Sequence, residues 1–303
     1  MPRAHLDDRG IVLVSGEDAK ALLQGLVTCD MDGVAPARAR FGSRARFGAL
    51  LSPQGKILFD FHVAEAAPDD GGGYHLDTIR GLGPDLVRRL TMYKLRANVL
   101  IEDRSDALGI VAAWGGDALP MEEGLLFDDP RLPALGQRLV TARDHATSLA
   151  DATAEAYHAH RIALGVPESG KDFMLSDAFP HEACMDALHG VDFEKGCYVG
   201  QEVVSRMQHR GTGGRTRVVP VVYEGGFAAS EGVEVTAGGR TIGTTGSQAG
   251  GRGLAKLRLD RVADAMAAGE PVTAGGIRLH AEKPAWARFA FPGEQAAHVA
   301  EGA

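Results

Sequence analysis

Pairs of glycine residues divide the last third of the chain, and they constrain its fold more than any other feature. Between residues 218 and 291, short runs rich in Val, Ile and Thr alternate with glycine turns, as in VVPVVYEGG, VEVTAGGRTIGTT and EPVTAGGIRLHA. Six or so short strands joined by tight turns are typical of a small β-barrel or sandwich. We therefore expect a C-terminal β-barrel domain over residues 215–303, with GRGLAKLRLD and WARFAF among its strands.

Residues 1–214 mix strands and helices instead. Alternation and turn residues predict strands at residues 10–16, 71–81, 97–103 and 108–114, and a hairpin around the SPQG turn at residues 49–66. Helical spacing predicts helices after a capping box of Ser15 and Asp18, at residues 82–95, and at residues 151–164 before Gly165. Residues 115–140 are rich in Gly and Pro and give no assignment. This order predicts an α+β region in two halves that divide near residues 105–110.

The charge balance limits the classes of partner. The chain of 303 residues has a formal net charge of −8, whereas proteins that neutralise many phosphates are usually basic. Stable nucleic-acid binding is therefore not expected. Two basic runs are interpreted either as solvated surface or as a site for an anionic small molecule or a limited patch of RNA. The first contains Arg38, Arg40, Arg44 and Arg46, and the second spans residues 206–217.

Cysteine usage and apolar segments bear on the expected location. Cys29, Cys184 and Cys197 are odd in number and widely spaced, which argues for a reducing compartment rather than a disulfide framework. We find neither a secretory signal nor an apolar run near the roughly 20 residues of a membrane span. A cytoplasmic protein without membrane contact is therefore expected. The histidines and cysteines between residues 181 and 209 match no metal-ligand spacing, so no metal site is expected.

The octapeptide KGCYVGQE, residues 195–202, places a cysteine between two glycines. Gly196 and Gly200 let the backbone bend or come close to another group. Cys197 lies near Lys195 and just before GQEVVSRM, which is typical of a helix start, and this setting lowers a thiol pKa. These local features leave two interpretations equally open, a reactive thiol or a small buried residue in a tight turn.

KGCYVGQE, continued by VVSR, resembles the signature of the YgfZ family. These proteins are folate-binding relatives of the glycine-cleavage T protein, and their bacterial and mitochondrial members take part in maturing or maintaining iron–sulfur proteins. GEDAKALLQGLVTCDM, LSPQGKILFDF, YKLRANVLIED, RIALGVP and FPHEACMD resemble further family segments in family order, from about residue 10 to about residue 290. The resemblance implies a T-protein-like α+β fold around a central folate pocket, followed by a C-terminal barrel.

The resemblance also implies which residues act. Cys197 would be a functional thiol near the pocket mouth, with Lys195 and the helix N-terminus favouring its thiolate and Glu202 and Arg206 fixing the turn. Tetrahydrofolate, or a folate derivative, would be held by Tyr157, Arg161, Asp60 and Arg9, and Arg161 and a basic run would meet its anionic tail. The whole motif is Lys195, Gly196, Cys197, Tyr198, Gly200, Gln201, Glu202 and Arg206.

Two positions weaken an aminomethyltransferase reaction like that of the T protein. Its hairpin strand carries adjacent aspartates where this chain has Phe59 and Asp60. Neighbouring strand residues face opposite sides, so Asp60 cannot take the place of the missing carboxylate. Alternation puts Phe59 on one face with Ile57, Phe61 and Val63, and Asp60 on the other with Lys56, Leu58 and His62. The acid at the end of the T protein's helix matches Ala163.

The leading hypothesis is a folate-binding accessory factor in iron–sulfur cluster assembly or maintenance, whose partners are iron–sulfur assembly proteins or client enzymes. One alternative is an enzyme, a folate-dependent aminomethyl or one-carbon transferase. A second is a factor related to tRNA modification through enzymes that carry clusters. A third is a protein-binding module that needs neither folate nor the thiol.

Overall fold

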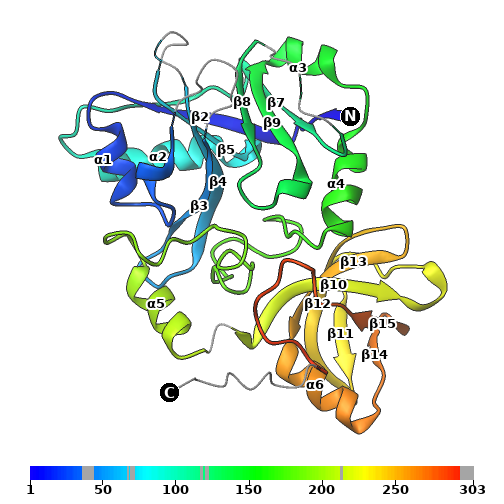
Figure 1. Ribbon diagram of the computed structural model, residues 1–303. Helices are drawn as coiled ribbons and strands as arrows, with labels where there is room; N and C mark the ends of the chain where they lie inside the picture. The colour runs from blue at the N-terminus through cyan, green and yellow to red at the C-terminus, as the bar shows by residue number, and fades with distance from the viewer. Residues whose placement is uncertain are drawn as a thin grey trace, which may run out of the picture.

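The computed structural model describes residues 1–35, 44–66, 68, 72–116, 119, 123–211 and 214–293. Within these ranges the chain forms two antiparallel sheets, a closed barrel and six α-helices (Figure 1). The helices are α1 (Ala19–Gln24), α2 (Gly83–Lys94), α3 (Arg143–Leu149), α4 (Ala154–Ala163), α5 (Gln201–His209) and α6 (Leu259–Ala268). None of these helices is both long and apolar enough to cross a bilayer. The expected α+β class with a C-terminal barrel is confirmed.

The first sheet has five strands in the order β3-β4-β5-β2-β6. Its strands are β2 (Arg9–Ser15), β3 (Arg46–Leu51), β4 (Ile57–Glu65), β5 (Tyr74–Ile79) and β6 (Leu100–Asp103). Side chains of α1 and α2, including Leu23, Leu86 and Leu90, share one buried apolar cluster with Val12 and Phe61 of the sheet. The burial of these apolar faces is the main force that holds the two helices on the sheet.

Asp18 begins α1 without the capping box expected with Ser15. No side chain caps this helix N-terminus, and the Asp18 carboxylate instead accepts a hydrogen bond from the backbone N–H of Asn98 at 2.7 Å. A contact with the segment that follows α2 therefore replaces the local cap.

The alternation expected in β4 is interrupted by a bulge. Leu50 lies opposite Phe59 while Leu51 lies opposite Ile57, so Leu58 is an extra residue in the ladder. As a result Leu58 packs against the same apolar cluster as Phe59, and Ile57 belongs to a different one. The strict two-face pattern thus holds only from Phe59 onward.

The second sheet has the order β1-β7-β9-β8. Its strands are β1 (Arg3–His5), β7 (Leu108–Ala113), β8 (Leu125–Asp128) and β9 (Gln137–Ala142). β1 comes from the start of the chain but pairs with β7, with Arg3 opposite Ala113. The stretch 115–140 that gave no assignment contains β8 and the start of β9.

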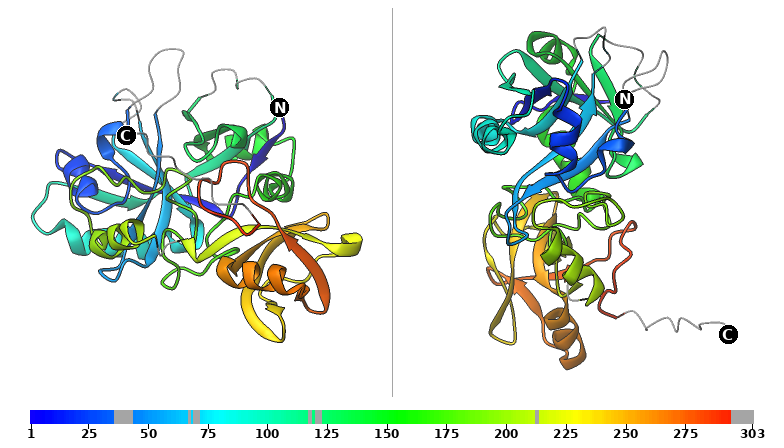
Figure 2. Two further views of the ribbon diagram at one scale, coloured as in Figure 1. Left: turned by 60° about the horizontal axis from the view of Figure 1, so that its bottom comes forward. Right: turned by 90° about the vertical axis from the view of Figure 1, so that its left-hand side faces the viewer.

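Six strands close the C-terminal barrel in the order β10-β13-β12-β11-β14-β15. They are β10 (Thr216–Tyr223), β11 (Glu234–Ala237), β12 (Arg240–Ala249), β13 (Arg252–Arg258), β14 (Val272–Ala274) and β15 (Ile277–Ala281). The barrel lies to one side of the two sheets in every view, and α4 contacts both β12 and β13 (Figures 1 and 2). The strand expected over GRGLAKLRLD ends at Arg258, because α6 begins at Leu259. One face of this helix, with Leu259, Val262 and Ala265, is buried in the apolar cluster of the barrel.

WARFAF, residues 286–291, is not a strand as expected. Trp286 donates its indole N–H to the Leu164 carbonyl at 2.8 Å, at the end of α4. The Arg217 guanidinium lies 4.5 Å from the centre of the Phe289 ring. Trp286 therefore joins this segment to the end of α4, while Phe289 stays in contact with Arg217 of the barrel strand β10.

Helix α5 begins at the expected position and rests on the β3–β4 turn through two glycines. Gly200 is the residue before the helix and has φ 83°, and a Cβ there would lie 2.6 Å from the Ser52 carbonyl oxygen. Gly55 in the turn has φ 80°, and its Cβ would meet Val203 at 3.0 Å. Neither position accepts a side chain without strain, so glycine is required at both.

Gly200→Ala should therefore lower the free energy of unfolding by about 1–3 kcal/mol, because alanine meets both an unfavourable φ and a backbone oxygen. Urea denaturation measures this change. Gly196→Ala is the matched control, since a Cβ at Gly196 would meet no heavy atom within 4 Å apart from its own chain neighbours. This control should change stability by less than about 0.5 kcal/mol. Equal effects of the two substitutions would contradict this account.

Candidate functional site

The signature segment is fixed by Lys195 on one side of the cysteine. Its ammonium group donates to the carbonyls of Gln24, Val27 and Cys29 at 2.9, 2.7 and 2.8 Å, where the chain leaves α1. Asp192 accepts from the backbone N–H of Lys195 at 2.9 Å. Burial lowers the pKa of Lys195. All three hydrogens of this ammonium have carbonyl partners, so Lys195 anchors the segment and is not a free cation beside a thiol.

Cys197 is exposed, whereas Cys29 and Cys184 are buried. Burial raises the pKa of both buried thiols to about 12, which makes them small apolar residues at neutral pH. The exposure of Cys197 argues against the interpretation as a small buried residue in a tight turn.

The residues after Cys197 attach the segment to the protein. Tyr198 is buried, and burial raises its pKa to about 12. Glu202 and Arg206 form the expected i,i+4 ion pair on the exposed side of α5, and Gln201 is the first residue of that helix. Cys197 therefore projects from a short segment that is held at both ends.

The four residues expected to hold folate are all buried, and each contacts other protein groups. Arg9 donates to the Asp77 carboxylate at 2.7 Å, and Asp60 accepts from the Ser169 hydroxyl at 2.5 Å. Tyr157 and Arg161 lie on α4, one turn apart, and enter two different polar networks.

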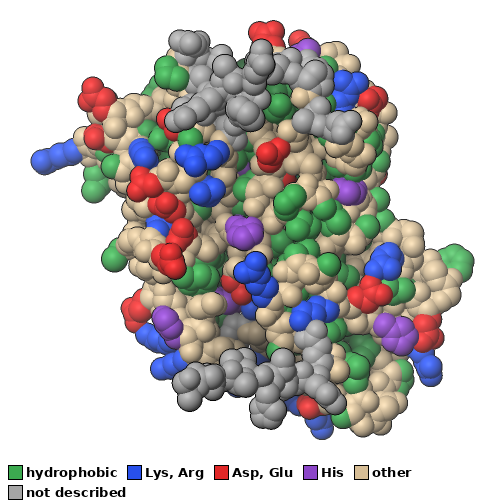
Figure 3. Space-filling model, in the orientation of Figure 1, with side chains coloured by type: hydrophobic (Ala, Val, Ile, Leu, Met, Phe, Trp, Pro, Cys, Tyr) green, Lys and Arg blue, Asp and Glu red, His purple; other side chains and the backbone are tan. Residues whose placement is uncertain are grey.

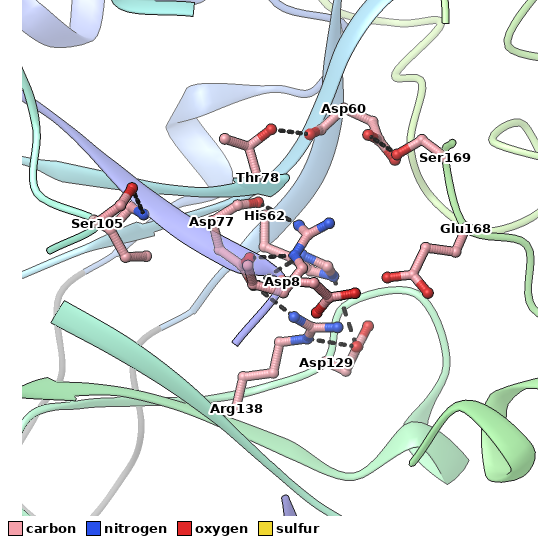
Figure 4. Close-up of polar contacts among 12 residues, drawn as sticks. Asp8, Asp60, His62, Asp77, Thr78, Ser105, Asp129, Arg138, Glu168 and Ser169 are labelled. Atoms are coloured by element: carbon pink, nitrogen blue, oxygen red, sulfur yellow. Dashed lines mark hydrogen bonds and ion pairs between the residues drawn. The ribbon is translucent and has the colours of Figure 1, made fainter. Parts of the chain in front are cut away.

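The first network joins the two sheets. Arg138 of β9 contacts Asp77 of β5 at 2.5 Å and Asp129, which follows β8, at 3.1 Å (Figure 4). The Tyr157 hydroxyl accepts from Arg138 at 3.0 Å, and Arg131 pairs with Asp129 at 2.7 Å. Burial opposes ionisation of Asp77, yet Arg9 and Arg138 outweigh it and hold the pKa of that carboxyl well below its usual range. The pKa of Asp129 is held low in the same way by Arg131 and His62.

His62 lies between the two aspartates, with its ring nitrogens 3.4 Å from Asp77 and 3.6 Å from Asp129. Burial and the nearby Arg138 lower its pKa. Sequence reasoning placed His62 with Asp60 on one face of the strand but did not find this network. The sequence signal that could have indicated the network is a set of charged residues inside strands, namely Asp77, Arg138 and Arg9.

The second network joins α4 to the barrel. Arg161 pairs with Asp172 at 2.7 Å and with Glu168 at 2.9 Å, and it donates to the Ser247 hydroxyl at 3.0 Å. Asp172 also accepts from the Ser247 backbone N–H at 2.8 Å. His158 lies 3.0 Å from Glu168, and although burial opposes it, hydrogen bonds to Asp8 and Glu168 raise the pKa of His158. Arg161 therefore acts in this structure as the link between α4 and β12.

A cavity of about 900 Å³ lies next to the signature segment. Its lining includes Arg44, Arg46, Arg288 and His189, together with four carboxylates and the ring of Phe193. The carboxylates are Asp30, Asp128, Asp192 and Glu194. Arg44 and Arg46 belong to the first basic run of the sequence, and Arg38 and Arg40 of that run lie outside the described residues. None of Tyr157, Arg161, Asp60 and Arg9 lines this cavity.

The described part of the chain contains no group of three or more His, Cys, Asp or Glu side chains placed to hold a metal ion. In the second basic run Arg206 pairs with Glu202 and Arg217 with Asp186, while Thr212 and Gly213 lie outside the described residues. On the face shown in Figure 3, basic and acidic side chains are interspersed.

Comparison with known proteins supplies the family. Residues 215–289 match the family model of the CAF17 C-terminal β-barrel domain. The mitochondrial iron–sulfur cluster assembly factor IBA57 homolog of Pyricularia oryzae is 33% identical over 89% of this chain and 75% of its own length. The Mus musculus IBA57 is 32% identical over 85% of this chain and 78% of its own length. The chain belongs to the IBA57 family of iron–sulfur cluster assembly factors.

One further relative and one solved structure add to this comparison. The Mycosarcoma maydis homolog is 35% identical over 73% of this chain, which spans 57% of that protein. The glycine-cleavage aminomethyltransferase T of Bartonella henselae has the same fold, with a TM-score of 0.70 at 16% identity over 96% of this chain and 87% of its own. The resemblance to T-protein relatives and iron–sulfur assembly factors is thereby confirmed. The cytoplasmic location expected from the sequence is wrong, because these IBA57 relatives are named mitochondrial.

Arg138→Met should lower the free energy of unfolding at pH 7 by about 3–5 kcal/mol, because it leaves Asp77 and Asp129 buried with fewer cationic partners. Urea denaturation measures the loss. Arg278→Met, at an exposed barrel position, is the control and should change stability by less than about 0.5 kcal/mol.

The effect of Arg138→Met should also depend on pH. The folded-state pKa of Asp77 and Asp129 lies below the unfolded value of about 4, so their contribution is present above that pH and is lost as pH falls. The difference between the wild type and Arg138→Met should therefore shrink in acid. A difference that grows below pH 4 would show that the network does not stabilise the fold through these ionised carboxylates.

Proposed function

We propose that this chain is an accessory factor in iron–sulfur cluster assembly or maintenance and that Cys197 is its functional thiol. The observation that carries the proposal is that Cys197 is exposed on a segment anchored by Lys195 before it and by Gly200 and α5 after it. The names of the IBA57 relatives support the same role.

A single thiol limits what Cys197 can do. Iron–sulfur clusters are usually held by four cysteine thiolates, and the other two cysteines of this chain are buried. Cys197 can therefore supply only one ligand, and the remaining ligands must come from a partner. The proposed step is contact between Cys197 and a cluster that an assembly protein or a client enzyme holds.

Cys197→Ala should reduce the activity of cluster-dependent enzymes in a deletion strain to the level without the gene, while the purified variant keeps its melting temperature. The thiol is exposed, so its removal leaves no cavity. Cys184→Ala is the matched control and should restore activity wherever it folds, because its thiol is buried. Full restoration by Cys197→Ala would instead favour a protein-binding module that needs no thiol.

Tetrahydrofolate, which the family resemblance implies, has a chemical match in the cavity of about 900 Å³. A pterin presents N–H donors that suit carboxylates, and the glutamate tail presents carboxylates that suit arginines. The cavity offers both kinds of partner, with Arg44 and Arg46 for the tail and Phe193 for stacking. Tyr157, Arg161, Asp60 and Arg9 lie outside this cavity, in contacts with other protein groups. When bound, the cofactor would supply one-carbon chemistry.

Arg46→Gln should weaken tetrahydrofolate binding about 10- to 100-fold in calorimetry, the effect of losing one charge-assisted hydrogen bond. Arg240→Gln, on an exposed barrel strand, should bind as the wild type does, and so should Cys197→Ala. Wild-type affinity in Arg46→Gln would place the ligand elsewhere. If the wild type does not bind tetrahydrofolate, folate is removed from the proposal, and the proposed role of the Cys197 thiol is unaffected.

The structure offers less support for an aminomethyltransferase. Phe59 is buried in the apolar cluster beneath α1 and α2, where the T protein has a carboxylate by resemblance. Asp60 accepts from Ser169 and lies among buried charges. Direct modification of tRNA is not proposed either, because the surface in Figure 3 mixes both signs of charge and the chain is acidic.

A further inference from the structure

A groove of about 460 Å³ runs along α2, away from the signature segment and its cavity. Its apolar lining comes from three parts of the chain, namely Leu58 and Phe59 of β4, Leu82 and Met92 at the two ends of α2, and Leu175. Phe59 and Leu58 both reach it because of the bulge in β4. Phe59, which stands where the T protein has a carboxylate by resemblance, therefore forms part of the apolar floor of this groove.

Large apolar side chains are exposed in the lining of this groove and close to it in the chain. Met92 is 68% exposed, Leu95 is 86% exposed and Met174, next to Leu175 in the chain, is 64% exposed. Met92 lies in the last turn of α2, and Leu95 is the first residue after this helix. Clusters of exposed apolar residues on a folded protein commonly mark a surface that another molecule covers.

Leu95 is exposed and also has an unfavourable backbone conformation. It has φ 48° and ψ −106°, and the Lys94 carbonyl accepts from the Ala97 N–H at 2.8 Å. This is a tight turn with Leu95 at the position where such turns favour glycine. Ser176, which lines the groove, also has a positive φ of 64°. Unfavourable backbone at a surface that gains no burial from it is typical of functional sites.

The charges at this edge indicate what covers it. Arg88 pairs with Asp85 within α2, but Arg89, Lys94 and Arg96 form no ion pair with any residue that the structure describes. Three unpaired cations stand out in a chain whose net charge is −8. Complementary charge at an interface selects a partner that bears carboxylates beside its apolar residues.

We propose that the α2 groove, with Met92 and Arg89 in its lining and the exposed Leu95 and Met174 close to its lining residues in the chain, binds an amphipathic acidic segment of a partner protein. A groove with an apolar floor fits an inserted helix or extended segment better than it fits a flat lipid surface. The inference does not rest on the role proposed for Cys197, so either can fail without the other.

The test uses two labelled peptides of about 16 residues, enough for four helical turns. Both carry leucine at helical spacing, and the remaining positions are Glu in one and Lys in the other. By fluorescence anisotropy the wild type should bind the Glu peptide at least about tenfold more tightly than the Lys peptide. Arg89→Glu should reduce this preference, since two of the three cations remain, and Leu95→Gly should weaken binding of the Glu peptide about tenfold.

Leu95→Gly should do this without loss of stability, because glycine suits the turn, and its melting temperature should stay level or rise. Phe227→Ser, at a side chain that is 80% exposed on the barrel, is the matched control and should bind as the wild type does. Equal affinity for the two peptides, or wild-type binding by Leu95→Gly, would overturn the proposal.

Two further outcomes would also overturn it. Binding of the wild type to phosphatidylglycerol vesicles that Leu95→Gly abolishes would assign the surface to a membrane. A concentration-dependent mass in light scattering that Leu95→Gly abolishes would assign it to a second copy of this chain.

Discussion

Arg138 is the point on which the two-sheet region depends. Its guanidinium bridges Asp77 on the first sheet and Asp129 beside the second, in a place that water does not reach. Neither carboxylate could stay ionised there without a cation, and the cation would be equally costly alone. The two halves of the region therefore fit together as a set of paired charges, to which Arg9 and Arg131 also belong, with the His62 ring between the two carboxylates.

The same kind of link attaches the barrel. Arg161 and Asp172 close on Ser247, while Trp286 returns from the barrel to the end of α4. These contacts leave the signature segment in a fixed place beside a cavity with both signs of charge. The exposed thiol and the α2 groove lie on different parts of this connected structure, so they form two separate surfaces.

Much of the fold could be predicted from the sequence, because it rests on local signals. Glycine pairs marked the barrel turns, alternation marked β2 and β5, and Pro84 and Gly165 marked helix ends. Other parts depended on contacts far along the chain. The start of α6 at Leu259 and the Trp286 segment were expected to be parts of strands, since short apolar runs fit either state, and the α1 cap was lost to Asn98.

Some features of the candidate site could also be predicted from the sequence, and others could not. The exposure of Cys197 agrees with the signature in which it was found, and the Glu202–Arg206 pair follows from spacing alone. The partners of Lys195 could not be predicted, because they are backbone carbonyls contributed by residues near α1. Buried pairs such as Arg9 with Asp77 likewise leave no local pattern, since each residue alone is only a charged residue in a strand.

The strand at the start of the chain has a consequence for how the protein forms. β1 completes the second sheet by pairing with β7, whereas β2, which follows it directly, belongs to the first. During synthesis the strands of the first sheet emerge before β7, so the backbone groups of β1 have no strand partner until β7 has left the ribosome. A fragment that starts after β1 would lack the edge strand of the second sheet and leave one side of β7 unpaired. A cut between the two sheets in the sequence therefore does not separate them, because β1 precedes the first sheet and belongs to the second.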